Sequence, residues 1–384
     1  MRNFFLIIVS CLLLTSCFKM PNDPYISPLQ VPGDFDWKSI EAKKVTITQV
    51  SSVLNEDGDT VASFLPPGDY GLIVGKTSTL RIVQEAATPS VQTKAPGDIK
   101  SKEKIYFPAK HKYATVMFED LFPSKGDMDM NDIVFGLNIT YYLDKSSNVI
   151  AFEISVEPRA LGSLAINIGL AAQLSSPNKL NIVENISHSR DPALASFFSV
   201  TTNNDGYSPE TGNIYSQVLP LTGDLRTYFD NTKDLFLNVR NVDVVTQTEE
   251  FSVLVEIKSA NVFPYSSMTF LETTQTGKIN LDIFAVVDSR GKEIHFKGQR
   301  ATDKFDFRYF MATWPKSDFS TVDNWVWAVI SDQSIRYNLE YVKIYNAYPN
   351  FKVWAEGGGA TNSDWYNPSV SDSLYKKSDY NYIN

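Results

Sequence analysis

The amino-acid sequence predicts a mainly β protein, dominated by a large antiparallel β-sandwich of the jelly-roll-like kind, with one short C-terminal helix. Three observations lead to this fold class. Apolar and polar residues alternate in runs such as 152–156 and 251–257, so that each strand buries one face. Aromatic residues make up 13% of the 384 residues, which favours strands over helical bundles. No repeat of about 20–50 residues is visible, which argues against propellers and solenoids.

Charge and composition narrow the classes of function. The net charge of −9 and a pI near 5.0 make nucleic acid an unsuitable partner. Three His and two Cys offer little material for a zinc site, an iron–sulfur cluster or Cys/His catalysis. Sites of these three kinds are therefore not expected.

Residues 1–16 are typical of a bacterial lipoprotein signal peptide. Arg2 supplies a positive charge, and an apolar stretch follows over 4–14. The sequence Leu-Thr-Ser-Cys that ends at Cys17 resembles the lipobox of bacterial lipoproteins, in which the Cys becomes the first residue and carries lipid. A plain secretory signal is the alternative. The resemblance implies a chain anchored to the outer membrane through Cys17, at the cell surface or on the periplasmic face.

Composition shifts divide the mature chain. Four prolines between positions 17 and 34 oppose helix and sheet and indicate a spacer. Residues 86–104 are polar, contain Pro and Gly and show no periodic spacing of apolar residues, which marks a second boundary. The predicted organisation is a tether over 17–34, a small β domain over 35–85, a linker over 86–104 and a large β domain over 105–384.

Within these regions, the elements follow from local patterns. Residues 144–148 combine Asp, Ser and Asn and predict a hairpin loop. A helical stripe over 339–348 predicts the single helix, which Pro349 would end. Strands are expected at 45–48, 71–74, 113–118, 133–143, 152–156, 235–239 and 251–257.

The densest chemistry lies between the strands expected at 113–118 and 133–143. Asp127, Asp129 and Asn131 follow an i, i+2, i+4 spacing, which in a tight loop turns alternate oxygens inward, as Ca²⁺ requires. An EF-hand is excluded, because its sixth position needs Gly and its twelfth needs Glu. The candidate metal ligands are Glu119, Asp120, Asp127, Asp129, Asn131 and Asp132.

Two other interpretations of these carboxylates stay open. They could cap backbone amides in an Asx-type turn that joins the two strands. Paired carboxylates could also serve as acid and base in glycan hydrolysis, provided that they flank a cleft. A cluster closed within one loop would favour the metal hypothesis over the hydrolase.

The acidic block also resembles the LruC domain, a family of bacterial envelope proteins. Three later blocks fit the same family in the same order. The matching residues are Phe118, Glu119, Asp120, Leu121, Gly126, Asp127, Asp129, Asn131 and Asp132; Glu293, Ile294 and His295; Trp327, Ala328, Val329 and Ile330; and Ala347, Tyr348, Pro349, Phe351, Trp354, Ala355, Asp364, Trp365 and Tyr366. The resemblance implies an exported, lipid-anchored, mostly β protein with no established enzymatic activity.

Together these observations predict a non-enzymatic cell-envelope lipoprotein, an adhesion or binding module with a calcium-type acidic loop. Its ligand would be a glycan or a host or envelope protein. The alternatives are an envelope glycan-binding protein, a glycan hydrolase that uses paired carboxylates, or a subunit of a surface appendage. Trp354, Trp365 and the tyrosines at 366, 375, 380 and 382 could stack on sugar rings, or the tryptophans could seal the helix exit. His295 is expected to be a half-buried structural residue.

Overall fold

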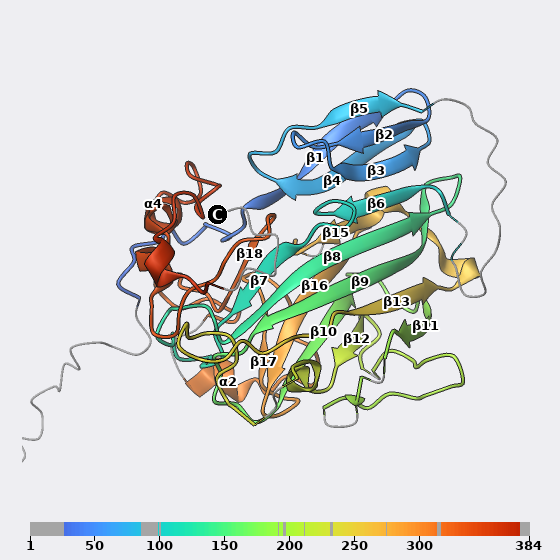
Figure 1. The fold of residues 1–384 in the computed structure, drawn as a ribbon. Coiled ribbons are helices and arrows are strands. Elements are labelled where there is room, and N and C mark those ends of the chain that lie inside the picture. The colour runs from blue at the N-terminus through green and yellow to red at the C-terminus, as the bar shows by residue number, and fades with distance from the viewer. Residues whose placement is uncertain are drawn as a thin grey trace, which may run out of the picture.

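A computed structural model of the chain describes residues 27–376 apart from 86–98, 100, 191, 195–196, 211, 231–232, 274 and 313–315. The predicted signal peptide, Cys17, the tether as far as residue 26, most of the predicted linker, and Tyr380 and Tyr382 lie outside the described residues. Two β-sheets packed face to face form the main body, and a third, two-stranded sheet lies beside them (Figure 1).

The larger sheet has 11 strands. Its two longest strands form a hairpin through the predicted loop at 144–148, in which Asp144 Oδ1 accepts hydrogen bonds from the backbone N–H groups of Ser146 and Asn148. β13 and β14 pair with the β9 side of this hairpin, and β11 follows β13, whereas the remaining strands lie on the β8 side. The strands outside the small N-terminal region are β6 (Lys104–Phe107), β7 (Ala114–Phe118), β8 (Ile133–Leu143), β9 (Asn148–Ala160), β11 (Val183–His188), β13 (Phe251–Ile257), β14 (Phe263–Pro264) and β18 (Ala328–Ser331).

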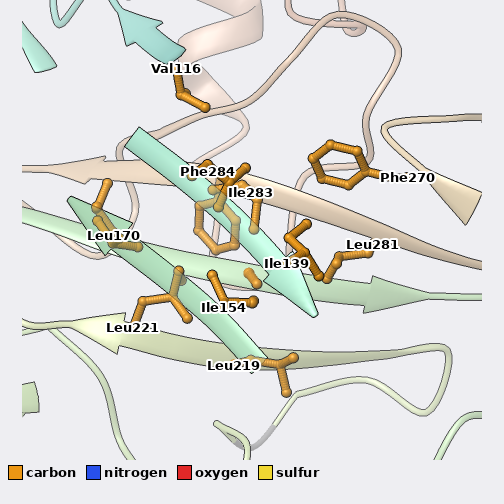
Figure 2. Close-up of a cluster of buried hydrophobic side chains, with 14 of the residues drawn as sticks. Val116, Ile139, Ile154, Leu170, Leu219, Leu221, Phe270, Leu281, Ile283 and Phe284 are labelled. Carbon is orange, nitrogen blue, oxygen red and sulfur yellow. The ribbon is translucent and has the colours of Figure 1, made fainter. Parts of the chain in front are cut away.

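The second sheet covers one face of the first and closes the sandwich. Its strands are β12 (Ser216–Thr222), β10 (Ile168–Ser175), β16 (Ile279–Val287), β15 (Met268–Phe270) and β17 (Glu293–Ile294). Figure 2 shows the core between the sheets, where Ile139 and Ile154 of the first sheet face Leu170, Leu219 and Ile283 of the second. Among the named strand pairs, only β15–β16 is parallel. The structure therefore confirms the predicted mainly β, antiparallel sandwich.

Five strands lie within 35–85: β2, β3 and β5 continue the larger sheet, and β1 and β4 form the two-stranded sheet. β3 pairs with β6 through Ala62–Ile105 and Ser63–Lys104, so main-chain hydrogen bonds join this region to the large one. β4 begins at Gly68, earlier than the strand that the sequence predicts from Gly71. The five strands are β1 (Ile40–Ile47), β2 (Ser51–Leu54), β3 (Thr60–Leu65), β4 (Gly68–Gly75) and β5 (Arg81–Gln84).

A second hydrophobic core, which we call the C-terminal core, lies beside the sandwich. It gathers α3 (Ile344–Ala347) and α4 (Pro349–Glu356) with buried residues from 29–37 and from 325–337. The predicted tether is therefore wrong for its last residues. Leu29 is buried there, and Pro32 O accepts a hydrogen bond from Asn324 Nδ2 at 2.5 Å. Leu29 and Val31 are apolar, so their packing against the C-terminal core is favoured in free energy over exposure to solvent.

Two local predictions need correction. The helix expected over 339–348 is reduced to α3 at 344–347, and Pro349 does not end the helical region. It begins α4 as a first-turn residue, where its missing N–H costs no hydrogen bond. A further short helix, α2 (Arg308–Ala312), precedes it. The strand expected over 235–239 is reduced to one bridge between Leu161 and Leu237, since Asn238 has a φ of 57° that breaks the extended run.

Candidate metal centre

The acidic loop joins β7 to β8 at one end of the sandwich. Phe118 and Ile133 are paired across the two antiparallel strands, so the residues that follow and precede them must lie together. Glu119 and Asp120 follow β7, and Asp132 precedes β8. The backbone N–H of Asp120 donates to Asp132 Oδ2 at 2.7 Å, which closes the base of the loop.

The loop alternates between two backbone conformations. Gly126, Met128 and Met130 have φ angles of 71°, 69° and 56°, and they alternate with Asp127, Asp129 and Asn131. Both methionine side chains are buried in the C-terminal core. Because alternate residues face opposite sides, the methionines fix the loop from the apolar side while the polar side chains gather on the other.

Three carboxylates meet in the loop. Glu119, Asp127 and Asp129 each place an oxygen within 4.8 Å of the others. Glu119 Oε1 accepts the backbone N–H of Met130 at 2.9 Å, whereas Glu119 Oε2 is buried without a partner. That oxygen lies where a Cβ of residue 126 would be, so the positive φ and the close approach both require Gly126.

Asp120 and Asp132, also predicted as ligands, have other partners. Asp120 Oδ2 accepts a hydrogen bond from the Ser163 hydroxyl, and Asp132 accepts the N–H of Asp120. Asn131, by contrast, keeps its side-chain oxygen buried and unpaired. The structure thus brings Glu119, Asp127 and Asp129 together as candidate ligands, and Asn131, whose backbone N–H donates to Asp129 Oδ1, adds a buried unpaired oxygen. Asp120 and Asp132 form hydrogen bonds at the base of the loop.

Sequence reasoning missed two residues that face the loop. Asn338 and Glu340 come from a segment that runs beside it, and Asn338 Oδ1 and Glu340 Oε2 are both buried without a partner. Tyr341 N donates to Asp129 Oδ2 at 2.7 Å, which ties the two segments together. More than 200 residues separate them in sequence, and the sequence predicts a helix over 339–348. The i, i+2 spacing of Asn338 and Glu340 was the one available signal.

Electrostatics in the loop are unfavourable for ionised carboxylates. Burial, reinforced by neighbouring carboxylates, raises the pKa of Glu119 and of Asp132 well above the ordinary range. Burial and the charge of Asp127 raise the pKa of Asp129 to about 8, and burial likewise raises the pKa of Glu340 to about 7. Such a group of acids is stable only when protons or a cation neutralise it.

The donor set identifies the class of cation that fits. Every candidate ligand offers a carboxylate or amide oxygen, and neither His nor Cys contributes to the loop. Oxygen-only sites suit hard cations such as Ca²⁺, whereas zinc and copper sites use nitrogen or sulfur. The unpaired buried oxygens are the positions that such an ion would satisfy.

A separate ionic cluster surrounds His295. His295 Nδ1 and Asp282 Oδ2 are 2.5 Å apart, and His295 Nε2 and Glu293 Oε2 are 2.9 Å apart. Burial opposes the charged imidazole, but the two carboxylates outweigh it and raise the pKa of His295 to about 9. Both ring nitrogens are occupied, and the residue is fully buried rather than half-buried as predicted. Arg290 also pairs with Glu293, so His295 and Arg290 together balance the two buried acids, and the role of this His is structural.

The C-terminal aromatic residues are part of a core. Trp354 and Trp365 are fully buried, and Tyr366 and Tyr375 are nearly so. Trp354 contacts Phe35 edge-on with ring centroids 4.9 Å apart. The two tryptophans therefore seal the end of α4, and none of these four rings is free to stack on a sugar.

Among the described residues, no helix is both long enough and apolar enough to cross a membrane. A search among curated proteins finds no match. One solved structure that does match is that of a Bacteroides ovatus protein carrying the provisional name lipoprotein, with a TM-score of 0.51 and 16% identity over 88% of this chain and 93% of that chain. At this identity the likeness concerns the fold. Residues 147–366 match the model described as "Domain of unknown function (DUF4842)", so the chain belongs to that family.

Proposed function

We propose that this protein is an exported, lipid-anchored cell-envelope protein of the LruC type, held at the outer membrane through Cys17. The lipobox-like sequence before Cys17 supports the anchor. The provisional lipoprotein name of the Bacteroides ovatus structure, which has the same fold, supports the compartment. Its role would be that of a non-enzymatic adhesion or binding module.

We further propose that the acidic loop holds Ca²⁺. The observation that carries this is the group of buried side-chain oxygens left without hydrogen-bond partners, Glu119 Oε2 and Asn131 Oδ1 among them, beside Asp127 and Asp129. A buried polar oxygen without a hydrogen-bond partner destabilises the fold. One divalent cation bound by several such oxygens would remove this cost for all of them. In an exported chain with one mature Cys, an ion would provide a cross-link that disulfides cannot.

The hydrolase alternative receives no support from the acidic loop. Glycan hydrolysis needs two carboxylates that face an open cleft. Glu119 and Asp129 are buried, and their oxygens converge with that of Asp127 within one loop. Screening the purified protein against glycans, envelope proteins and a panel of glycan substrates tests this directly. Turnover of any substrate would contradict the non-enzymatic proposal.

The calcium proposal is tested by thermal unfolding of the purified chain in calcium and in chelator at pH 7.5. A ligand that binds only the folded state stabilises it by about 2.7 kcal/mol at roughly 100 times its Kd. For a domain of this size, that is a rise of several degrees in Tm. Identical melting curves in calcium and chelator, with metal-free protein, would leave only the Asx-turn interpretation.

A further inference from the structure

A C-terminal segment lies along the acidic loop and binds it through backbone groups. Tyr341 N donates to Asp129 Oδ2 at 2.7 Å, and Ile344 N donates to Met128 O at 2.8 Å. In the opposite direction, Asn131 Nδ2 donates to Asn338 O at 3.3 Å. The segment 338–344 is therefore held to the loop at three successive points.

The same segment presents oxygens that have no hydrogen-bond partner. Asn338 Oδ1 and Glu340 Oε2 are both buried and unpaired. A Cβ added at Gly162 would meet Glu340 Oε2 and Asn131 Oδ1 together, so the two oxygens face one small space above that glycine. The next residue, Tyr341, donates its backbone N–H to Asp129 Oδ2 at 2.7 Å, which places Glu340 beside the acids of the loop.

We infer that Asn338 and Glu340 complete the calcium site, so that the bound ion fastens the C-terminal segment to the end of the sandwich. The inference rests on the proposed calcium function of the loop. The loop supplies four side chains, and these two residues bring the number to six, within the six to eight oxygen ligands that Ca²⁺ takes. The four loop ligands are Glu119, Asp127, Asp129 and Asn131.

The consequence of such a link reaches both ends of the described chain. The segment leads directly into α3 and α4, and α3 has only four residues, so little regular hydrogen bonding holds this region. Leu29, Phe35 and Trp37 pack against the same helices in the C-terminal core. Without the ion, residues 338–356 would open locally more often than the sandwich does. Segments with few hydrogen bonds need less free energy to open, and their amide hydrogens therefore exchange faster.

Glu340→Gln tests the inference, with Glu356→Gln as a matched control on the same segment. Glu356 lies on α4, where its carboxylate pairs with Lys352 and accepts the backbone N–H of Gln30. Calorimetric titration with CaCl₂ should show the Kd of Glu340→Gln raised by about tenfold or more, and that of Glu356→Gln unchanged. Hydrogen exchange should show calcium protecting both 119–132 and 338–356 in the wild-type chain. In Glu340→Gln saturated with calcium, protection should be confined to 119–132.

The outcomes separate this inference from the calcium proposal itself. Wild-type affinity together with wild-type protection of 338–356 in Glu340→Gln would overturn the inference and leave the calcium site in place. No calcium binding by the wild-type chain would overturn both. Should Glu340→Gln lose the wild-type circular dichroism spectrum, Glu340→Asp serves instead. The shorter Asp side chain keeps the negative charge but moves the carboxylate oxygens away from the site. Weakened calcium binding is therefore again expected, and wild-type binding would again overturn the inference.

Discussion

Met128 and Met130 explain how a loop with so many carboxylates keeps one conformation. Both side chains are buried in the C-terminal core, so hydrophobic burial opposes the repulsion between the acids on the other side of the loop. Each methionine adopts a positive φ, which is uncommon for residues with a side chain. The backbone strain and the charge repulsion are concentrated at one place, as is typical of functional sites.

The first residue-scale prediction concerns Asp129→Asn, which removes one charge and retains an acceptor oxygen. We expect the variant to lose the rise in Tm that calcium causes. In chelator at pH 8 it should melt at the wild-type temperature or above, because one buried like charge is gone. Thermal unfolding in both buffers measures this, with Asp372→Asn, at an exposed position, as the control that keeps the calcium response. A response of wild-type size in Asp129→Asn would contradict the assignment.

The second residue-scale prediction concerns pH. The pKa of Asp129 is about 8 in the calcium-free fold against 3.8 ordinarily. Between these values the folded chain holds a proton that the unfolded chain has released, so the free energy of unfolding should fall as pH rises. Calcium displaces that proton, and its stabilising effect should therefore grow from pH 5 to pH 8. Melting temperatures with and without calcium across this range measure the effect. If the rise in melting temperature caused by calcium were the same at every pH, the ligands would not be buried carboxylates.

At the scale of elements, α4 links the two ends of the described chain. It begins at Pro349, which needs no hydrogen-bond donor there, and it buries Phe351, Trp354 and Ala355. Trp354 contacts Phe35 and Trp37 from the N-terminal segment as well as Trp365 from the C-terminal one. One helix of eight residues therefore fastens segments that lie more than 300 residues apart in sequence.

This arrangement predicts a large effect for Trp354→Ala. Replacing a fully buried Trp by Ala leaves a cavity, and the expected loss is about 3–5 kcal/mol of the free energy of unfolding. Val353→Ala is the matched control, because Val353 is the neighbouring residue on α4 and is 52% exposed. Its effect should stay within about 0.5 kcal/mol. Denaturant titration compares the two variants, and equal effects would show that the C-terminal core contributes little to stability.

At the scale of the whole molecule, the sandwich and the C-terminal core share the acidic loop. Glu119 directly follows the sandwich strand β7 and Asp132 directly precedes β8, whereas Met128 and Met130 belong to the C-terminal core. The N-terminal segment 27–37 enters this same core. A lipid anchor at Cys17 would therefore be connected, through a short stretch of chain, to the part of the molecule that holds the candidate metal site.

Cys17→Ala tests the anchor in cells. The variant has no thiol to accept lipid, so we expect it to leave the membrane fraction and to lose the mass added by the acyl chains. Cys11→Ala changes the second Cys of the chain, which lies inside the predicted signal peptide, and this variant should remain lipidated and membrane-bound. Fractionation followed by mass spectrometry distinguishes these outcomes. Membrane retention of Cys17→Ala at the wild-type level would refute the predicted lipoprotein anchor.

The sequence by itself determined the fold class and the position of the acidic loop, because both depend on short-range patterns. Alternation over 152–156 and 251–257 marks strands of a sheet with one buried face, and the spacing of Asp127, Asp129 and Asn131 is visible within five residues. Only the tertiary structure decided what completes the site. Asn338 and Glu340 lie more than 200 residues away, and no local pattern specifies which segment crosses the loop. The burial of 27–34 and the start of α4 at Pro349 likewise depend on the C-terminal core, whose packing overrides local preferences.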